Sequence, residues 1–468
     1  MAVGSARVRF RDVFAVAEYR WLWLAQILSV AGDQLARVAL TVLVYSRTHS
    51  PALTAVTYAV TYVPWLIGGF TLSGLADRFP RRAVMISCDV ARALLVVGMA
   101  APGMPLWAMV VLLFVVTLLD VPFKSARAAM VADVLAGDHY VLGTAVTQMT
   151  IQTGMVSGFA IGGVVVGFLG ARTALAADAA TFVLSALMVR YGVRQRPAAA
   201  GSPRQADPAP AAAEAPGRAY PAPAAAGETG QAYPAPAAAV AAQDAVVDAV
   251  AAPVPQSRVA GMSAGVRLVF GDTRLRALMM LGWLAAFYSV AEPLAVPYAA
   301  RIGGGAAAAG LVFAAGPAGT VIGSVVFTRF VEPERRLRWM GPLSVGCCLV
   351  LMLCLLRPGL TVSIVIFLVS GAMGAYQLPA NAAFVAAVPN RRRGQAFGLA
   401  NAGMQVSQGV VYVLAGAAAA AATPAAVIGI AGAVGAAAAC LLALNWHHMA
   451  SLELAPLQSP SRTRQDRR

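Results

Sequence analysis

The feature that most constrains this chain is a series of twelve apolar runs, most of them close to twenty residues long. An α-helix rises about 1.5 Å per residue, so about 20 apolar residues cross a hydrocarbon core of about 30 Å. Helices of soluble proteins carry a polar face, which these runs lack. With 59% hydrophobic and only 12% charged residues, the chain is predicted to be an all-α membrane protein with twelve transmembrane helices.

The runs fall into two sets of six, which predicts two pseudo-symmetric six-helix bundles. The first set lies near residues 21–45, 52–74, 83–101, 106–131, 142–168 and 173–193, and the second near 274–299, 306–328, 339–356, 360–384, 395–418 and 424–446. We expect the bundles at 21–193 and 274–446, a disordered Ala- and Pro-rich linker at 194–273, and tails at 1–20 and 447–468. A gap-free similarity at an offset of 257 residues, as between Pro122 and Pro379, indicates parallel repeats with a substrate path between them.

The positions of the basic residues predict the orientation of the helices. If the N-terminus is cytoplasmic, the outer loops hold only Arg47, Arg172, Arg301 and Arg357, while Arg37 and Arg92 lie within helices. The remaining Lys and Arg residues then lie in inner segments, as the positive-inside rule requires. Both termini are therefore expected to be cytoplasmic in a plasma-membrane protein. The net charge of +15 indicates topology and attraction to anionic lipids, and argues against a nucleic-acid partner.

No constellation of residues for soluble enzyme chemistry is apparent in the sequence. The five cysteines lie in apolar segments without the spacing of metal ligands, so neither a metal site nor a disulfide is expected. The chain has one lysine, Lys124, and it follows Phe123 rather than the glycine of a phosphate-binding loop. We therefore expect no cofactor and no nucleotide-binding motor in this chain, and an enzyme lacks candidate residues.

Three motifs point to a known family. The loop after the second predicted helix reads Ser-Gly-Leu-Ala-Asp-Arg-Phe-Pro-Arg-Arg over residues 73–82, and the segment 388–394 reads Val-Pro-Asn-Arg-Arg-Arg-Gly. The fifth helix carries glycines at 154, 158, 162 and 163, with Phe159 among them. The first loop resembles the signature loop of the major facilitator superfamily. The glycine string is similar to the exporter motif of its drug–proton antiporters, with Phe159 in place of a proline. The subgroup that the chain most resembles is that of siderophore-type and macrolide-type exporters.

The resemblance implies a cytoplasmic gate at the signature loop, formed by Asp77, Arg78, Arg81 and Arg82. Asp77 is expected to face the N-terminus of the eleventh helix near Gly394, where unpaired backbone amides favour an anion. Arg81 or Arg82 is expected to pair with Asp133 and so to hold the halves together. The alternative is that the loop is merely solvated and positively charged.

Ionisable residues deep in a membrane are costly and are often functional. Asp33 lies near the predicted midplane and Arg37 one turn further on, so Asp33 is a candidate proton-binding residue. The alternative is a static bridge between these two residues. Glu292 and Asp120 are further candidates for proton coupling. Glu292 would alternatively lie near the outer headgroups, and Asp120 would alternatively pair with an inner arginine, whereas Asp89 and Arg92 are expected to be structural.

Polar residues on cavity-facing helices form a candidate substrate site. Spacings of three and four residues place several of them on common helix faces. They either line a wet cavity or form hydrogen bonds between helices. The candidates are Gln34, Thr144, Gln148, Gln152, Gln377, Asn401, Gln405 and Gln408.

These observations predict a secondary active transporter that exports a small amphipathic organic molecule by proton antiport, with alternating access between two bundles. Its expected partners are the substrate, protons and the lipid bilayer. The direction of transport follows from the resemblance alone. An uptake permease of the same fold and a non-transporting receptor or scaffold remain alternatives.

Overall fold

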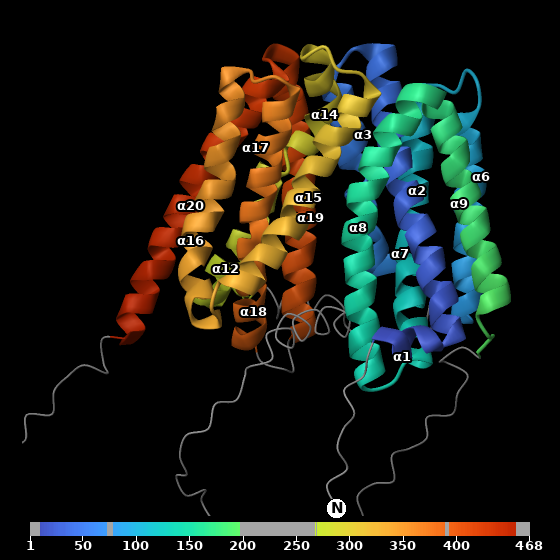
Figure 1. Ribbon diagram of the computed structural model, residues 1–468, viewed down its shortest axis with the longest axis horizontal. Coiled ribbons are helices and arrows are strands. Elements are labelled where there is room, and N and C mark those ends of the chain that lie inside the picture. Colours follow the sequence, from blue (N-terminus) through green and yellow to red (C-terminus); the bar gives the residue numbers. More distant parts are fainter. Residues whose placement is uncertain (1–9, 73–77, 197–266, 268, 389–392, 455–468) are drawn as a thin grey trace, which may run out of the picture.

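The computed structural model describes residues 10–72, 78–196, 267, 269–388 and 393–454, and the elements in these ranges are all helices (Figure 1). The predicted linker lies almost entirely outside the described residues. Two groups of helices stand side by side, with the N-terminal half in blue to green and the C-terminal half in yellow to red.

The N-terminal half contains eight described helices. They are α1 (Phe10–Ala15), α2 (Ala17–Thr48), α3 (Pro51–Val60), α4 (Val63–Thr71), α6 (Arg81–Ala100), α7 (Leu106–Val134), α8 (Asp138–Leu169) and α9 (Ala171–Gly192). The second predicted span is broken between α3 and α4. Pro64 lies in the first turn of α4 and lacks an amide hydrogen, so the helix hydrogen bonding is interrupted there.

The C-terminal half repeats this plan with more interruptions. It consists of α12 (Thr273–Trp283), α13 (Ala285–Tyr288), α14 (Ala291–Arg301), α15 (Ala306–Phe330), α16 (Pro333–Leu349), η2 (Val350–Leu356), α17 (Leu360–Met373), η3 (Gly374–Tyr376), α18 (Gln377–Ala387), α19 (Arg393–Ala421) and α20 (Pro424–Leu454). The first span of this half is interrupted at Ser289, just before Pro293. The last helix runs beyond its predicted end at 446.

Eleven segments of the described chain are long and apolar enough to cross a membrane. Each corresponds to one predicted span, and the broken pair α3 and α4 occupies the place of the twelfth. The structure therefore agrees with the predicted helix count and with the division into six and six.

The two halves meet at the end of the molecule that lies away from α1 and from the last turns of α20 (Figure 1). There α8 packs on α15, where Gly163 lies against Gly310, and α3 packs on α19 at Gly416. Near the termini, the long-range side-chain hydrogen bonds of the described chain join helices of one half, as from the Tyr19 hydroxyl to the Gly143 carbonyl at 2.8 Å. The two halves are therefore in close contact at the far end, which is called here the closed end.

Substituting Gly163 tests how closely the halves pack. A Cβ atom at this position would lie 2.6 Å from the Gly310 Cα and 2.8 Å from the Ala306 carbonyl oxygen. We expect Gly163→Val to destabilise the closed end by about 1–3 kcal/mol, because backbone atoms cannot move aside cheaply. Gly167→Val is the matched control, since a Cβ there meets no atom nearer than 3.6 Å. Thermal unfolding in detergent measures both, and equal midpoints would contradict the prediction.

Candidate functional site

Two of the cavities in the membrane-spanning part of the described chain adjoin candidate residues. The larger of these two, of about 260 Å³, lies between the halves and is called here the interdomain cavity. The smaller, of about 40 Å³, lies within the N-terminal half beside a group of buried and half-buried charged residues. Asp33, Asp89, Arg92, Asp120, Lys124 and Asp178 form this group, called here the N-bundle cluster.

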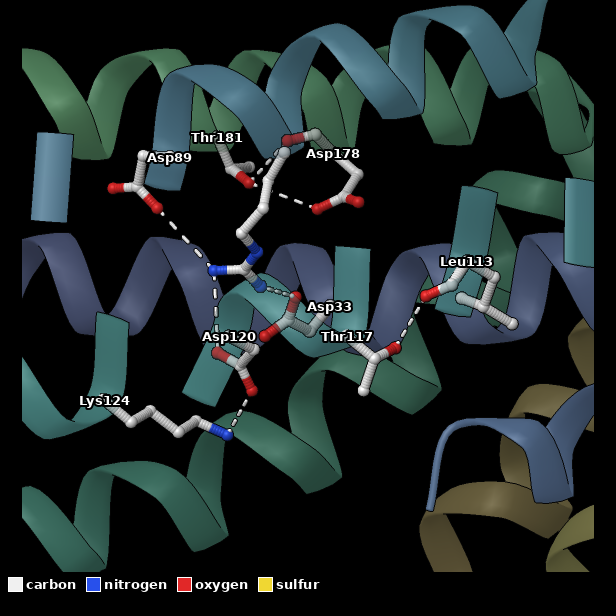
Figure 2. Close-up of polar contacts among 9 residues, drawn as sticks. Asp33, Asp89, Leu113, Thr117, Asp120, Lys124, Asp178 and Thr181 are labelled. Carbon is white, nitrogen blue, oxygen red and sulfur yellow. Dashed lines mark hydrogen bonds and ion pairs between the residues drawn. The ribbon is translucent and has the colours of Figure 1, made fainter. Parts of the chain in front are cut away.

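Arg92 of α6 is the centre of the N-bundle cluster. Its Nη2 donates a hydrogen bond to Asp33 Oδ1 of α2 at 2.7 Å, and its Nη1 lies 3.6 Å from both Asp89 Oδ1 and Asp120 Oδ1 (Figure 2). Lys124 lies one turn beyond Asp120 on α7, with its Nζ 2.7 Å from Asp120 Oδ2. One guanidinium therefore joins carboxylates from three helices.

Asp178 of α9 adds a fourth carboxyl group to the N-bundle cluster. It is 1% exposed, and it accepts a hydrogen bond from the Thr181 hydroxyl on the same helix (Figure 2). Phe182, one turn on, lies under the Arg92 guanidinium at 4.0 Å from the ring centroid. Arg92 and Lys124 are the basic side chains of the cluster, and Arg37 and Arg127 add positive charge near it. Several ionisable groups therefore share a site in which each ionised carboxylate depends on nearby cations.

The structure corrects the predicted partner of Asp33. Sequence spacing suggested Arg37, one turn away on the same helix, but the ion pair in the described chain is with Arg92. Arg37 lines the smaller cavity and interacts electrostatically with Tyr58 and Glu292 as well as Asp33. Arg92, which was expected to be structural, also contacts Asp33 of α2 and Asp120 of α7, and helical spacing within α6 reveals neither contact.

Glu292 of α14 lies between the halves. The Tyr58 hydroxyl of α3 donates a hydrogen bond to Glu292 Oε2 at 2.8 Å, across the interface. The Tyr58 ring stacks on Phe313 of α15 with centroids 5.9 Å apart and lies 5.7 Å from the Tyr412 ring of α19. This carboxyl group is therefore held within an aromatic contact between the halves.

Phe159 lies within the glycine string of α8, at the position where the similar exporter motif has a proline. The side chain is fully buried, and its ring stacks on Phe313 with centroids 5.1 Å apart. The adjacent glycines have no side chains, so α2 and α15 can approach α8 closely. A Cβ atom at Gly158 would lie 2.9 Å from the Gln34 Cβ. Phe159 thus fills the interface between the halves.

The interdomain cavity is lined mainly by the C-terminal half, with Gln152 and Met155 contributed by α8. Of the predicted cavity residues, Gln152, Gln377 and Gln408 line it, together with Glu292. The Gln377 amide donates a hydrogen bond to the Tyr288 hydroxyl at 2.8 Å.

The other predicted cavity residues are not among the described residues that line this cavity. Gln34 and Thr144 are buried, and Gln34 packs at the contact between α2 and α8. Gln148 and Asn401 lie closer to the start of α8 and α19 than the residues that line the cavity, whereas Gln405 lies between the lining residues Met404 and Gln408 and on another face of α19. The sequence predicted polar faces on α8 and α19. It did not predict which residues of these faces line the cavity.

The predicted gate is described only in part. Asp77 lies outside the described residues, and the structure places Gly394 in the first turn of α19. Arg78 is exposed, Arg81 pairs with Asp133, and Arg82 donates a hydrogen bond to the Arg190 carbonyl. The expectation that the Asp133 pair joins the halves is wrong, because Arg81 and Asp133 belong to α6 and α7 of the same half.

Comparisons with known proteins agree with this architecture. The chain is similar to two proteins of Bacillus subtilis (strain 168), the uncharacterised MFS-type transporters YkuC, at 26% identity over 184 residues, and YfiS, at 25% over 171 residues. These matches cover 38% and 36% of this chain, and 42% and 41% of the relatives. The chain spans about two fifths of the length of these curated relatives.

Solved structures share the fold. A mutant of the nucleoside transporter NupG superposes with a TM-score of 0.66 at 13% identity, covering 92% of this chain and 99% of that one. An inward-facing, unoccupied bacterial homologue of the human lysosomal transporter Spinster gives a TM-score of 0.59 at 14% identity, covering 94% and 96%. These likenesses confirm the predicted fold of two six-helix bundles. Because the family model of the Major Facilitator Superfamily matches residues 22–372, the chain belongs to that superfamily and is a multi-pass membrane protein.

Proposed function

We propose that this transporter exports a small amphipathic organic molecule across the plasma membrane by proton antiport. The termini are placed in the cytoplasm on the basis of the distribution of Lys and Arg. With that orientation, the closed end faces outward and the arrangement is inward-facing, as expected for an exporter ready to take up substrate from the cytoplasm.

The N-bundle cluster is the observation that carries this proposal. It gathers four carboxyl groups around Arg92 within the membrane-spanning part of the chain, where ionised groups are costly, so it is suited to take up and release a proton. Asp33 is proposed as the coupling residue, because its side chain is 23% exposed, whereas Asp89 is fully buried. Asp120 and Arg37 both line the smaller cavity beside it.

The proton step and the substrate step are linked through the interface between the halves. Arg37 interacts electrostatically with both Asp33 and Glu292, and Glu292 is bonded to Tyr58 across the interface. A change of charge at Asp33 would therefore change the electrostatic interaction of Arg37 with Glu292, and with it the contact between Glu292 and Tyr58 at the closed end. The signature loop, with Asp77, Arg78, Arg81 and Arg82, is proposed as the opposing gate near Gly394.

Efflux measurements test the proposed function. Cells or vesicles carrying the transporter are loaded with a panel of fluorescent amphipathic cations, antibiotics and siderophores, and efflux is followed with and without the pH gradient. We expect collapse of the gradient, or Asp33→Asn, to reduce efflux at least about tenfold, as for loss of an essential intramembrane acid. Asp138→Asn, at an exposed position in the first turn of α8, is the control.

Two results would count against this function. If the Asp33→Asn variant still exports the substrate, and its efflux does not depend on the pH gradient, Asp33 has a structural role only. Inward accumulation of a nutrient, with growth that depends on it, would favour the uptake permease. A scaffold would keep its function in Asp33→Asn, because it needs no buried acid.

A further inference from the structure

The interdomain cavity contains an unusual combination of groups. Glu292 is the one acidic side chain among the described residues that line it, and no Lys, Arg or His is among them. The Glu292 carboxylate accepts a hydrogen bond at Oε2 from the Tyr58 hydroxyl, which is a neutral donor. The described cavity thus has a carboxylate and no basic side chain of its own. Arg37, which interacts electrostatically with Glu292, lines the smaller cavity instead.

The walls around this carboxylate are aromatic, thioether and amide groups. Tyr288, Phe313 and Phe367 supply aromatic rings, and Met155 and Met404 supply thioethers. Aromatic faces attract cations, and thioethers adapt to apolar surfaces of varied shape. An anion would meet repulsion from Glu292 and would find no basic partner on the described walls.

From this combination we propose that the interdomain cavity binds organic monocations with aromatic or aliphatic bodies, and that Glu292 is the counter-ion for their positive charge. The inference rests on the proposed function, since it names the substrate class of the same transporter. Glu292 is then a specificity-determining residue, distinct from Asp33, the residue proposed to couple protons. The cavity volume of about 260 Å³ suits a compact organic ion better than a peptide or a large siderophore.

Direct binding to the purified, full-length protein in lipid nanodiscs tests this inference. The probe is radiolabelled tetraphenylphosphonium, measured by equilibrium dialysis. We expect saturable binding that Glu292→Gln weakens at least about tenfold, a loss of about 1.4 kcal/mol. The glutamine keeps an oxygen that accepts the Tyr58 hydrogen bond, so this variant removes the charge and not the interdomain contact. Glu332→Gln, at an exposed position beside Arg335, should bind as the wild type does.

A second measurement needs no variant. Unlabelled ethidium should displace the probe from the wild-type protein, whereas triphenylphosphine oxide, which has three of the four phenyl rings but no net charge, should not. Equal displacement by the neutral compound, or equal binding of the probe by Glu292→Gln and wild type, would overturn the proposal. Absence of any saturable binding of the cation would overturn it as well.

The efflux measurement separates this inference from the proposed function. If tetraphenylphosphonium binds through Glu292 but is not driven by a pH gradient, the cation site stands and proton-coupled export fails. If the pH gradient drives efflux of neutral or anionic compounds only, with Glu292→Gln as active as wild type, export stands and the cation site fails.

Discussion

Replacing Arg92 with glutamine is expected to abolish transport and to destabilise the N-terminal half more than any other single change in the N-bundle cluster. Arg92 is 1% exposed and lies within 3.6 Å of Asp33, Asp89 and Asp120. Removing it leaves these carboxyl groups buried without their shared cation, and loss of one partner from a buried ion pair costs about 3–5 kcal/mol. The thermal unfolding midpoint in detergent and the yield of monodisperse protein measure the effect.

Charge compensation provides the control for Arg92. In the double variant Arg92→Gln/Asp89→Asn, one of the uncompensated carboxyl groups is removed, and we expect part of the lost stability to return. Asp89 is chosen because it is fully buried and is not proposed to carry the transported proton. Arg92→Lys keeps the charge, but a single ammonium group cannot reach carboxylates on three helices in the same geometry. Wild-type stability in Arg92→Gln would show that the cluster does not depend on this cation.

The sequence predicted the spans well because a bilayer imposes a simple rule of length and apolarity. Length and apolarity do not predict which backbone hydrogen bonds form within a span. The breaks before Pro64 and Pro293 were therefore missed, although proline itself was a readable signal. The first of these breaks lies beside Tyr58, and the second lies beside Glu292, where the aromatic contact between the halves is built.

The candidate site was predicted as residue types on helix faces rather than as an arrangement in space. Spacing along α2 paired Asp33 with Arg37, because a pattern within one helix reveals only neighbours on that helix. The contact with Arg92 depends on how α2, α6, α7 and α9 pack. The place of Asp178 in the cluster was missed for the same reason.

Replacing Tyr58 with phenylalanine is expected to loosen the closed end while leaving the aromatic packing in place. The change removes one hydroxyl, the donor of the 2.8 Å hydrogen bond to Glu292 Oε2, and keeps the ring that stacks on Phe313. A hydrogen bond to a charged group contributes about 1.5–3 kcal/mol. The population closed at this end should therefore fall about tenfold to a hundredfold relative to the open one.

Hydrogen–deuterium exchange measures this shift, because peptides from α3 and α14 are protected only while the halves meet there. Faster exchange in these two peptides, with unchanged exchange in α9, is the result expected for Tyr58→Phe. Tyr45→Phe is the matched control: its ring contacts His49, and no hydrogen bond from its hydroxyl is found in the described chain. Unchanged exchange in α3 and α14 would mean that ring stacking and the close contact at Gly163 and Gly310 hold the closed end without this bond. In that case Glu292 would act only in binding the substrate. Faster exchange would mean that the same carboxylate both binds the substrate and stabilises the contact between the halves.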